Sequence, residues 1–251
     1  GFIDWLVARG IAVCGHDHAG HGDSIRDKDH YGYFARKNGH RVLTQDAHAV
    51  SVYVKDELPL GTPFILMGHS MGSFVARDYI SHYGKEIDGV IVMGTGGPNP
   101  AASAGIVLAH TISALCGPMC RPKLINDIAF GGYTSRIENA LTGYEWLSRD
   151  PEIIEKYARD ERCTFIFTVS AFADLFKILA RVNTKRWGAS VPTALPILLI
   201  AGSEDPVGNY GEGVKQVLAL LQKAGHQNTD LVLYPEMRHE ILNELDKETV
   251  W

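Results

Sequence analysis

The sequence has no run of basic residues and no excess of positive charge. Its 24 Lys and Arg are outnumbered by 29 Asp and Glu, which gives a formal net charge of -5. Proteins that hold a nucleic-acid backbone need clustered Lys and Arg to displace counterions from the phosphates. We therefore expect no nucleic-acid partner. Any contact with a membrane is expected to be transient and peripheral, and to depend on apolar side chains.

Cysteine is also scarce, with four residues at positions 14, 116, 120 and 163. That number is too small for a disulfide scaffold and is more typical of proteins in a reducing compartment. Cys116 and Cys120 have no second cysteine pair with which to complete a zinc ribbon. We expect a cytoplasmic protein without a structural zinc site.

Long apolar runs are missing as well. The most apolar long stretch, residues 101–116, is interrupted by polar residues and is shorter than the roughly 20 residues that a membrane-spanning helix needs. Residues 1–10 lack an initiator Met, a basic segment and a small-residue cleavage site. We expect no transmembrane segment and no signal peptide, and the opening residues predict a helix.

Apolar runs alternate with helical patterns over the first 98 residues and again after residue 190. Amphipathic helices are predicted between buried strands at residues 11–17, 63–69, 87–93, 195–201 and 231–234. This alternation is typical of an α/β fold, a mostly parallel sheet with helices on both faces. With 45% hydrophobic residues, the chain can bury one large core.

The alternation stops between residues 99 and 190, where helices and loops are predicted but no buried strand. We therefore expect one α/β domain, built from residues 1–98 and 191–251, with a helical insert at 99–190. The apolar residues at 104–115 have two interpretations, as the core of the insert or as a face turned to lipid. The residues after 241 predict the start of a further helix.

A nucleophile motif follows the predicted strand 63–69 directly. Gly68-His69-Ser70-Met71-Gly72 has the G-x-S-x-G pattern of a strand-to-helix turn that exposes a reactive serine. Glycines on either side of the serine let the strand and the helix approach each other closely. The sequence predicts Ser70 as a nucleophile and the backbone N–H of Met71 as a donor to a developing oxyanion.

A serine hydroxyl needs an imidazole base, and that base needs a carboxylate to fix its tautomer. Asp205 follows the predicted strand 195–201, and His239 follows the strand 231–234. The order Ser, acid, His is that of the α/β-hydrolases. Glu204 is the rival acid, because a shift of one residue in the loop is not decided by the sequence.

The chain resembles the monoacylglycerol lipase and lysophospholipase family of serine α/β-hydrolases. The matching segments span nearly the whole chain: DHAGHGDS at 17–24, GHSMG at 68–72, FGGY at 130–133, WLSRDP at 146–151, DPVG at 205–208 and HEILNE at 239–244. The resemblance implies a triad of Ser70, Asp205 and His239, and a lid or cap formed by the insert. It also implies cleavage of a lipid ester with one acyl chain and no cofactor.

The sequence departs from the family at both ends. The family carries a His-Gly motif upstream of the helix with which this chain opens, and the backbone of that motif supplies part of the oxyanion hole. We expect this chain to lack that segment and part of the final helix. Losing one oxyanion donor typically lowers kcat about 10²- to 10³-fold, so weak catalysis is expected.

Three other interpretations accompany this one. His16, His18 and His21 resemble a metal-ligand pattern, but Gly20 stands where its Asp belongs, so no metal is expected. A serine aminopeptidase or short-chain esterase of the same fold would use the same triad. A non-catalytic protein that binds acyl ligands, or an inactive fragment, is the alternative from another class. The oligomeric state is left open.

An imidazole base must be neutral to accept a proton, so the rate of hydrolysis is expected to fall below about pH 6 to 7.

Overall fold

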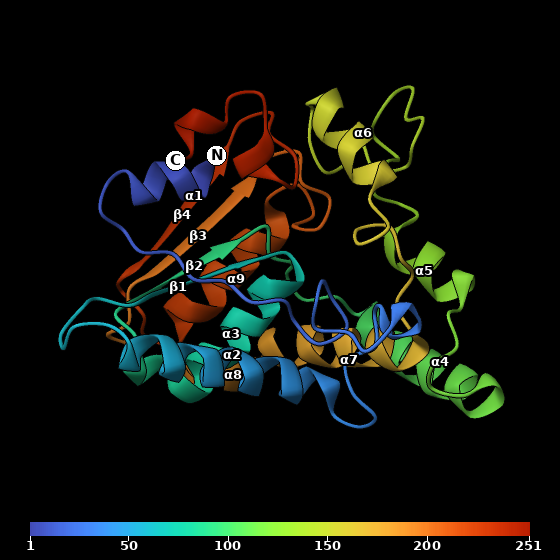
Figure 1. Cartoon of the computed structure of the whole chain (residues 1–251), viewed down its shortest axis with the longest axis horizontal. Helices are drawn as coiled ribbons and strands as arrows, with labels where there is room; N and C mark the ends of the chain where they lie inside the picture. Colours follow the sequence, from blue (N-terminus) through green and yellow to red (C-terminus); the bar gives the residue numbers. More distant parts are fainter.

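A computed structural model describes all residues, 1–251, and contains one parallel sheet of four strands. The strands lie side by side in chain order (Figure 1): β1 (Ile65–His69), β2 (Gly89–Met93), β3 (Ile197–Gly202) and β4 (Thr229–Tyr234). Four of the five predicted strands are therefore confirmed. In a parallel sheet all strands end at the same edge, which is where the predicted chemistry-bearing residues follow β1, β3 and β4.

The predicted strand at 11–17 is wrong. Residues 11–18 have no regular secondary structure, and Ile11 and Val13 are largely exposed. The apolar residues have strand character, but a strand also requires a neighbour for its backbone groups, and β1 pairs only with β2. Pairing depends on distant segments, which the local pattern does not report.

One face of the sheet carries the main hydrophobic core. Because successive side chains of a strand point to opposite faces, Val90 and Val92 of β2 enter this core while Ile91 and Met93 face the other side. The core is covered by helices α2 (Gly39–Asp56), α3 (Met71–Tyr83), α8 (Lys185–Ser190) and α9 (Glu212–Lys223). Helices α2 and α9 are amphipathic as predicted, whereas α3 is buried over most of its length. Helices α3 and α9 pack directly on the strands.

The second face carries a smaller core around Met93, Ile200, Met237 and Ile241. Helix α1 (Phe2–Val7) and the 3-10 turns η3 (Ile241–Asn243) and η4 (Lys247–Thr249) lie on this side. The opening helix is confirmed. The helix predicted after residue 241 is replaced by these two short turns.

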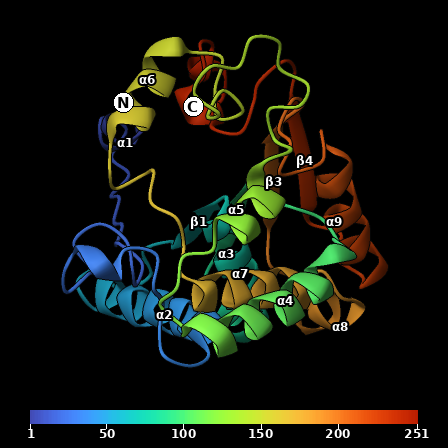
Figure 2. The same cartoon turned by 90° about the vertical axis from the view of Figure 1, so that its right-hand side faces the viewer.

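Between β2 and β3 the chain forms helices and loops without a strand. Helices α4 (Ala101–Cys116) and α7 (Val169–Val182) lie side by side (Figure 2), with α5 (Lys123–Phe130) against them and α6 (Pro151–Arg159) further away. Ala109, Ile125 and Phe172 form a separate small core there. Ile178 and Val182 of α7 instead join the main core. The insert boundaries at 99 and 190 stay a prediction.

No helix of the structure has both the length and the apolar character needed to cross a membrane. Helix α4 is the most apolar candidate. Its residues Val107 and Leu115 are exposed, while Ala102 and Ala109 are buried.

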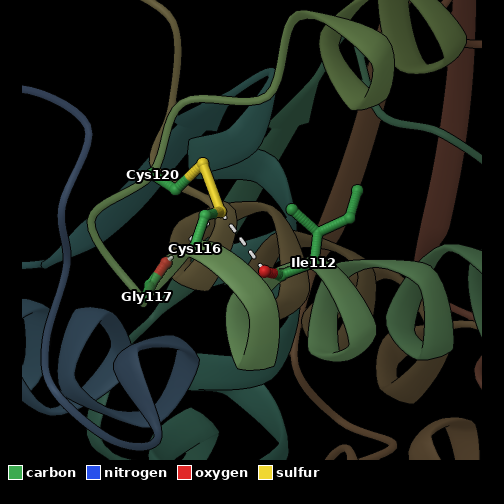
Figure 3. The surroundings of a disulfide bond; sticks show 4 residues. All are labelled: Ile112, Cys116, Gly117 and Cys120. Atoms are coloured by element: carbon green, nitrogen blue, oxygen red, sulfur yellow. Dashed lines mark hydrogen bonds between the residues drawn. A yellow bond between two sulfur atoms is a disulfide. The ribbon is translucent and has the colours of Figure 1, made fainter.

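The expectation of reduced cysteines is corrected at one pair. Cys116, at the end of α4, is joined to Cys120 by a disulfide (Figure 3), with a Cα–Cα distance of 5.9 Å. The reason is the turn between them, because Gly117 has a φ of 87° and reverses the chain. Cys14 and Cys163 are exposed free thiols.

Candidate active site

Ser70 sits in the turn between β1 and α3. Its φ of 54° and ψ of -123° are unusual for a residue with a side chain, which is the strained conformation expected of a nucleophile turn. The N–H of Ser70 donates to the carbonyl of Met93 in β2 at 3.0 Å, and Ser73 donates its N–H back to the carbonyl of Ser70 at 2.9 Å. These bonds hold the turn at the carboxyl edge of the sheet.

Gly68 explains why this turn requires glycine. A Cβ at Gly68 would overlap the backbone carbonyl of Gly72 and come within 2.8 Å of the side chain of Ala76. The strand and the helix thus touch through their backbones, as the sequence pattern predicts.

Met71 is the first residue of α3, immediately after Ser70. The N–H groups in the first turn of a helix have no partner within the helix, and the helix dipole favours negative charge there. The backbone N–H of Met71 is therefore a suitable donor to an anion at Ser70.

His239 and Asp205 are brought together in the interior. The Nδ1 of His239 donates to Oδ2 of Asp205 at 2.9 Å, and both side chains are essentially inaccessible, at 1% and 0% exposure. The other carboxylate oxygen accepts the N–H of Val207 at 2.9 Å. The second imidazole nitrogen, Nε2 of His239, is buried without a hydrogen-bond partner.

No hydrogen bond joins Ser70 to His239 in this structure. The ring of His69, next to Ser70 in the chain, packs at a tilt of 40° against the ring of His239, with centroids 4.5 Å apart. The Nε2 of His239 has no partner, so it makes no bond to the serine in this structure. Catalytic hydrogen bonds in ligand-free enzymes are often long and tighten only with substrate.

Glu204, the rival acid, is exposed and makes no side-chain hydrogen bond to His239. Its backbone N–H donates to the carbonyl of Met237, but its carboxylate makes no bond to His239. The structure therefore brings Asp205, and not Glu204, to the histidine.

Three neighbours of the His239 ring were not predicted. His69 donates its Nε2–H to the backbone carbonyl of His239 at 3.1 Å. Trp146 packs on the ring with centroids 5.0 Å apart, and a Cβ at Gly94 would lie 3.0 Å from the ring. Trp146 belongs to the WLSRDP segment that carries the family resemblance, but no sequence pattern indicates which residue between β2 and β3 contacts the histidine.

The pKa values of two side chains near His239 and Asp205 are shifted by their surroundings. Burial, with a smaller contribution from the charge of Asp205, raises the pKa of Tyr133 to about 12. Burial, followed by the proximity of His239, lowers the pKa of His69 to about 3. Both side chains are therefore neutral at pH 7.

The histidines of residues 16–21 form no metal centre. Nε2 of His16 lies 3.2 Å from Nδ1 of His18, while His21 packs its ring on Phe34. No group of three or more His, Cys, Asp or Glu side chains is arranged to hold a metal ion. The carboxylate of Asp17 instead closes its own loop by accepting the N–H of Asp23 at 2.9 Å.

Comparison with known proteins gives a consistent family. The family described as serine aminopeptidase, S33, matches residues 1–246. A thermostable carboxyl esterase from Bacillus coagulans, crystallised with glycerol, is 31% identical with a TM-score of 0.90, covering 99% of this chain and 79% of that one.

Two curated relatives are named for lipid substrates. The monoacylglycerol lipase of Mycolicibacterium smegmatis is 24% identical over 97% of this chain and 76% of its own length. The monoglyceride lipase of Homo sapiens is 25% identical over 97% of this chain and 71% of its own length. These similarities extend over the sheet and the insert alike.

Proposed function

The chain belongs to the serine aminopeptidase S33 family of α/β-hydrolases and is a serine ester hydrolase, and we propose that it cleaves a monoacylglycerol or a lysophospholipid. In this proposal Ser70 is the nucleophile, His239 the general base and acid, and Asp205 the residue that orients His239. The observation that carries the proposal is the buried hydrogen bond between His239 and Asp205 at 2.9 Å, at the strand edge where Ser70 sits.

The tautomer of His239 decides which nitrogen is free to act. Because Nδ1 donates its proton to Asp205, Nε2 carries a lone pair and no proton in the neutral ring. That nitrogen is buried and makes no other bond, so no competing group has to be displaced before it takes a proton. Nε2 is therefore the atom assigned to the serine hydroxyl.

The reaction follows in two halves. As Ser70 attacks the ester carbonyl, its hydroxyl proton passes to Nε2 of His239, and the carbonyl oxygen becomes an oxyanion near the N–H of Met71. The tetrahedral intermediate collapses, His239 gives the proton to the leaving alcohol, and the acyl group stays on Ser70. A water molecule then repeats the sequence and releases the fatty acid. No metal or organic cofactor has a role in these steps.

A row of aromatic side chains supports an acyl substrate. From His239, ring centroids follow one another at 5.0 Å to Trp146, 4.9 Å to Tyr133, 5.7 Å to Phe130 and 6.2 Å to Phe172. The row connects the imidazole with the small core between α4, α5 and α7. Aromatic surface of this kind favours an apolar chain over a charged one.

The test is hydrolysis of a monoacylglycerol by the whole chain, with Ser70→Ala and His239→Gln as comparison variants. Loss of the serine or the histidine of such a triad typically lowers kcat about 10⁴- to 10⁶-fold. A lysophosphatidylcholine in the same assay separates the two substrate classes. Hydrolysis that persists in Ser70→Ala would contradict the assignment of the nucleophile.

The family description favours one second candidate, a serine aminopeptidase. The triad chemistry does not choose between ester and amide, so substrate ranking has to. We expect kcat/KM for monoacylglycerols to exceed that for aminoacyl arylamides. The reverse order would support the aminopeptidase, whereas binding of acyl ligands without turnover would support a non-catalytic protein.

A further inference from the structure

We propose that Glu244 is a positioning residue for His239, an inference that rests on the proposed role of His239 as the base. Glu244 ends the loop that carries His239, and its carboxylate ties that loop to residues 144–149 of the insert. It makes no contact with the reacting atoms. Its role is to fix the backbone from which the imidazole projects.

The carboxylate of Glu244 is completely buried and fully used. Its Oε1 accepts the backbone N–H of Arg238 at 2.8 Å and of Arg149 at 3.1 Å. Its Oε2 accepts the guanidinium Nε–H of Arg149 at 2.9 Å and the backbone N–H of Leu245 at 3.2 Å. Two donors from its own loop and two from Arg149 of the insert therefore converge on this one carboxylate.

The same two segments meet along their backbones beside the histidine. The N–H of His239 donates to the carbonyl of Trp146 at 3.3 Å, and the N–H of Glu240 donates to the carbonyl of Leu147 at 2.6 Å. The Trp146 ring packs on the imidazole in the same place. These contacts hold only while the loop and the insert segment stay in register, which is what the bonds of Glu244 enforce.

Arg238 adds a second connection in the opposite direction. Its Nη1 donates to the carbonyls of Glu145, at 2.7 Å, and Ser148, at 3.1 Å. The hydroxyl of Ser148 donates to the carbonyl of Asn243 at 3.1 Å. Because the N–H of Arg238 is itself held by Glu244, the residue before His239 is fixed at both its backbone and its side chain.

The other side of His239 is held by the nucleophile turn. His69 donates to the carbonyl of His239. The backbone N–H of His239 is thus bound to the insert, and its C=O is bound to the residue before Ser70. With Asp205 fixing the ring, the imidazole is located relative to three separate parts of the chain. Loss of the insert connection would leave the ring with its acid partner but with a mobile backbone.

The ion pair of Glu244 and Arg149 is built to persist. Partial burial lowers the pKa of Arg149, but the bonds and charges of Glu244 and Asp246 outweigh it and raise that pKa above its ordinary value. Asp246 accepts from Nη2 of Arg149 at 3.0 Å and is exposed. It contacts the same guanidinium without reaching the loop around His239, and so offers a matched control.

The test measures kcat and KM for p-nitrophenyl butyrate, a short ester, in the whole chain and in Glu244→Ala, Glu244→Gln and Asp246→Asn. Rates are expressed per folded molecule, using the thermal melt of each variant. Misplacing a catalytic group by about 1 Å can lower the rate about 10²-fold. We expect Glu244→Ala to lower kcat about 10- to 100-fold while KM changes less than about threefold.

Glu244→Gln supplies the conservative comparison. A glutamine Oε1 can still accept the N–H groups of Arg238 and Arg149, whereas its NH₂ group cannot accept from the guanidinium. We expect a smaller loss of kcat than in Glu244→Ala, and an unchanged kcat in Asp246→Asn. This grading distinguishes positioning from mere stability, which would lower the melting temperature and leave kcat per folded molecule unchanged.

An unchanged kcat per folded molecule in both Glu244 variants would overturn the proposal. Should both fail to fold, Arg149→Ala decides the question from the partly exposed side of the same ion pair. An unchanged kcat in that variant also contradicts the proposal. Failure of the proposed function has a separate signature, because hydrolysis would then survive His239→Gln.

Discussion

The backbone N–H of His239 donates to the carbonyl of Trp146, and the indole of Trp146 packs on the imidazole of the same residue. The segment between α5 and α6 is therefore part of the wall around the histidine. This contact joins the insert to the strand edge where Ser70 and Asp205 lie.

Replacing Asp205 by Asn tests the choice of acid. When the Asn oxygen accepts from the N–H of Val207, its NH₂ group faces Nδ1 of His239 and donates to it, which favours the wrong tautomer of the ring. We expect Asp205→Asn to lower kcat about 10⁴-fold in ester hydrolysis. Glu204→Gln, one residue away and exposed, is the matched control and is expected to leave kcat unchanged. Equal losses in the two variants would contradict the assignment of the acid.

Replacing Gly68 by Ala tests the geometry of the nucleophile turn. The new methyl group would overlap the carbonyl of Gly72, so the strand and helix must move apart. We expect a lower melting temperature and a slower reaction of Ser70 with a fluorophosphonate. Gly132→Ala is the control, since a Cβ there meets nothing within 4 Å. A melting temperature for Gly68→Ala equal to that of the unmodified chain would show that the turn is less tightly packed than described.

Removing the carboxylate of Asp174 tests how α2 is attached to α7. Asp174 is buried, accepts the N–H of Gly39 at 2.9 Å and pairs with Nδ1 of His40 at 2.8 Å. Asp174→Ala leaves these donors without a partner and is expected to lower the free energy of unfolding by about 3–5 kcal/mol. The exposed pair of Lys123 and Asp127 gives the comparison, because Asp127→Ala is expected to lower the free energy of unfolding far less. Urea unfolding measures both, and similar losses would contradict the prediction.

The free energy of unfolding is predicted to decrease as the pH is lowered below 7, because of His69. Burial lowers its pKa in the folded chain to about 3, whereas the unfolded chain takes up the proton near pH 6.5. Between these two pH values the unfolded state therefore binds more protons than the folded state. The contribution of His69 to the slope of the unfolding free energy against pH reaches about 1.4 kcal/mol per pH unit. The contribution is fully present above about pH 6.5 and is lost as the pH falls.

The measurement is the free energy of unfolding from pH 7 to pH 5 in the unmodified chain and in His69→Gln. Glutamine keeps an N–H donor for the carbonyl of His239 but does not titrate. The variant is expected to show a shallower decline. His18, whose pKa is lowered to about 4 by burial and the neighbouring histidines, acts in the same direction in both proteins. Identical slopes would mean that His69 is not the group responsible.

The strands and the nucleophile turn could be predicted because their sequence signals are local. Each of the four strands contains a short apolar run, although only the central strands β2 and β3 are largely buried. The G-x-S-x-G turn follows β1 directly, and Asp205 and His239 follow later strands in the order that the fold requires. These features need only a few consecutive residues and their place along the chain.

Two of the three features that were predicted wrongly or not at all depend on segments far apart in the chain, and the third depends on the conformation of one turn. Residues 11–17 have the composition of a strand, but no neighbouring segment completes their backbone hydrogen bonds. The disulfide of Cys116 and Cys120 depends on the reversed chain at Gly117. The contact of Trp146 with His239 depends on how the insert packs against the loop after β4. None of these arrangements leaves a periodic trace in the sequence.

The most direct test of the central claim is the labelling of the chain by a fluorophosphonate, followed by peptide mapping. Such reagents modify serines that are activated as nucleophiles, so we expect the label on Ser70 alone, and far slower labelling in His239→Gln. A chain that melts cooperatively and yet stays unlabelled, or carries the label on another serine, would contradict the account.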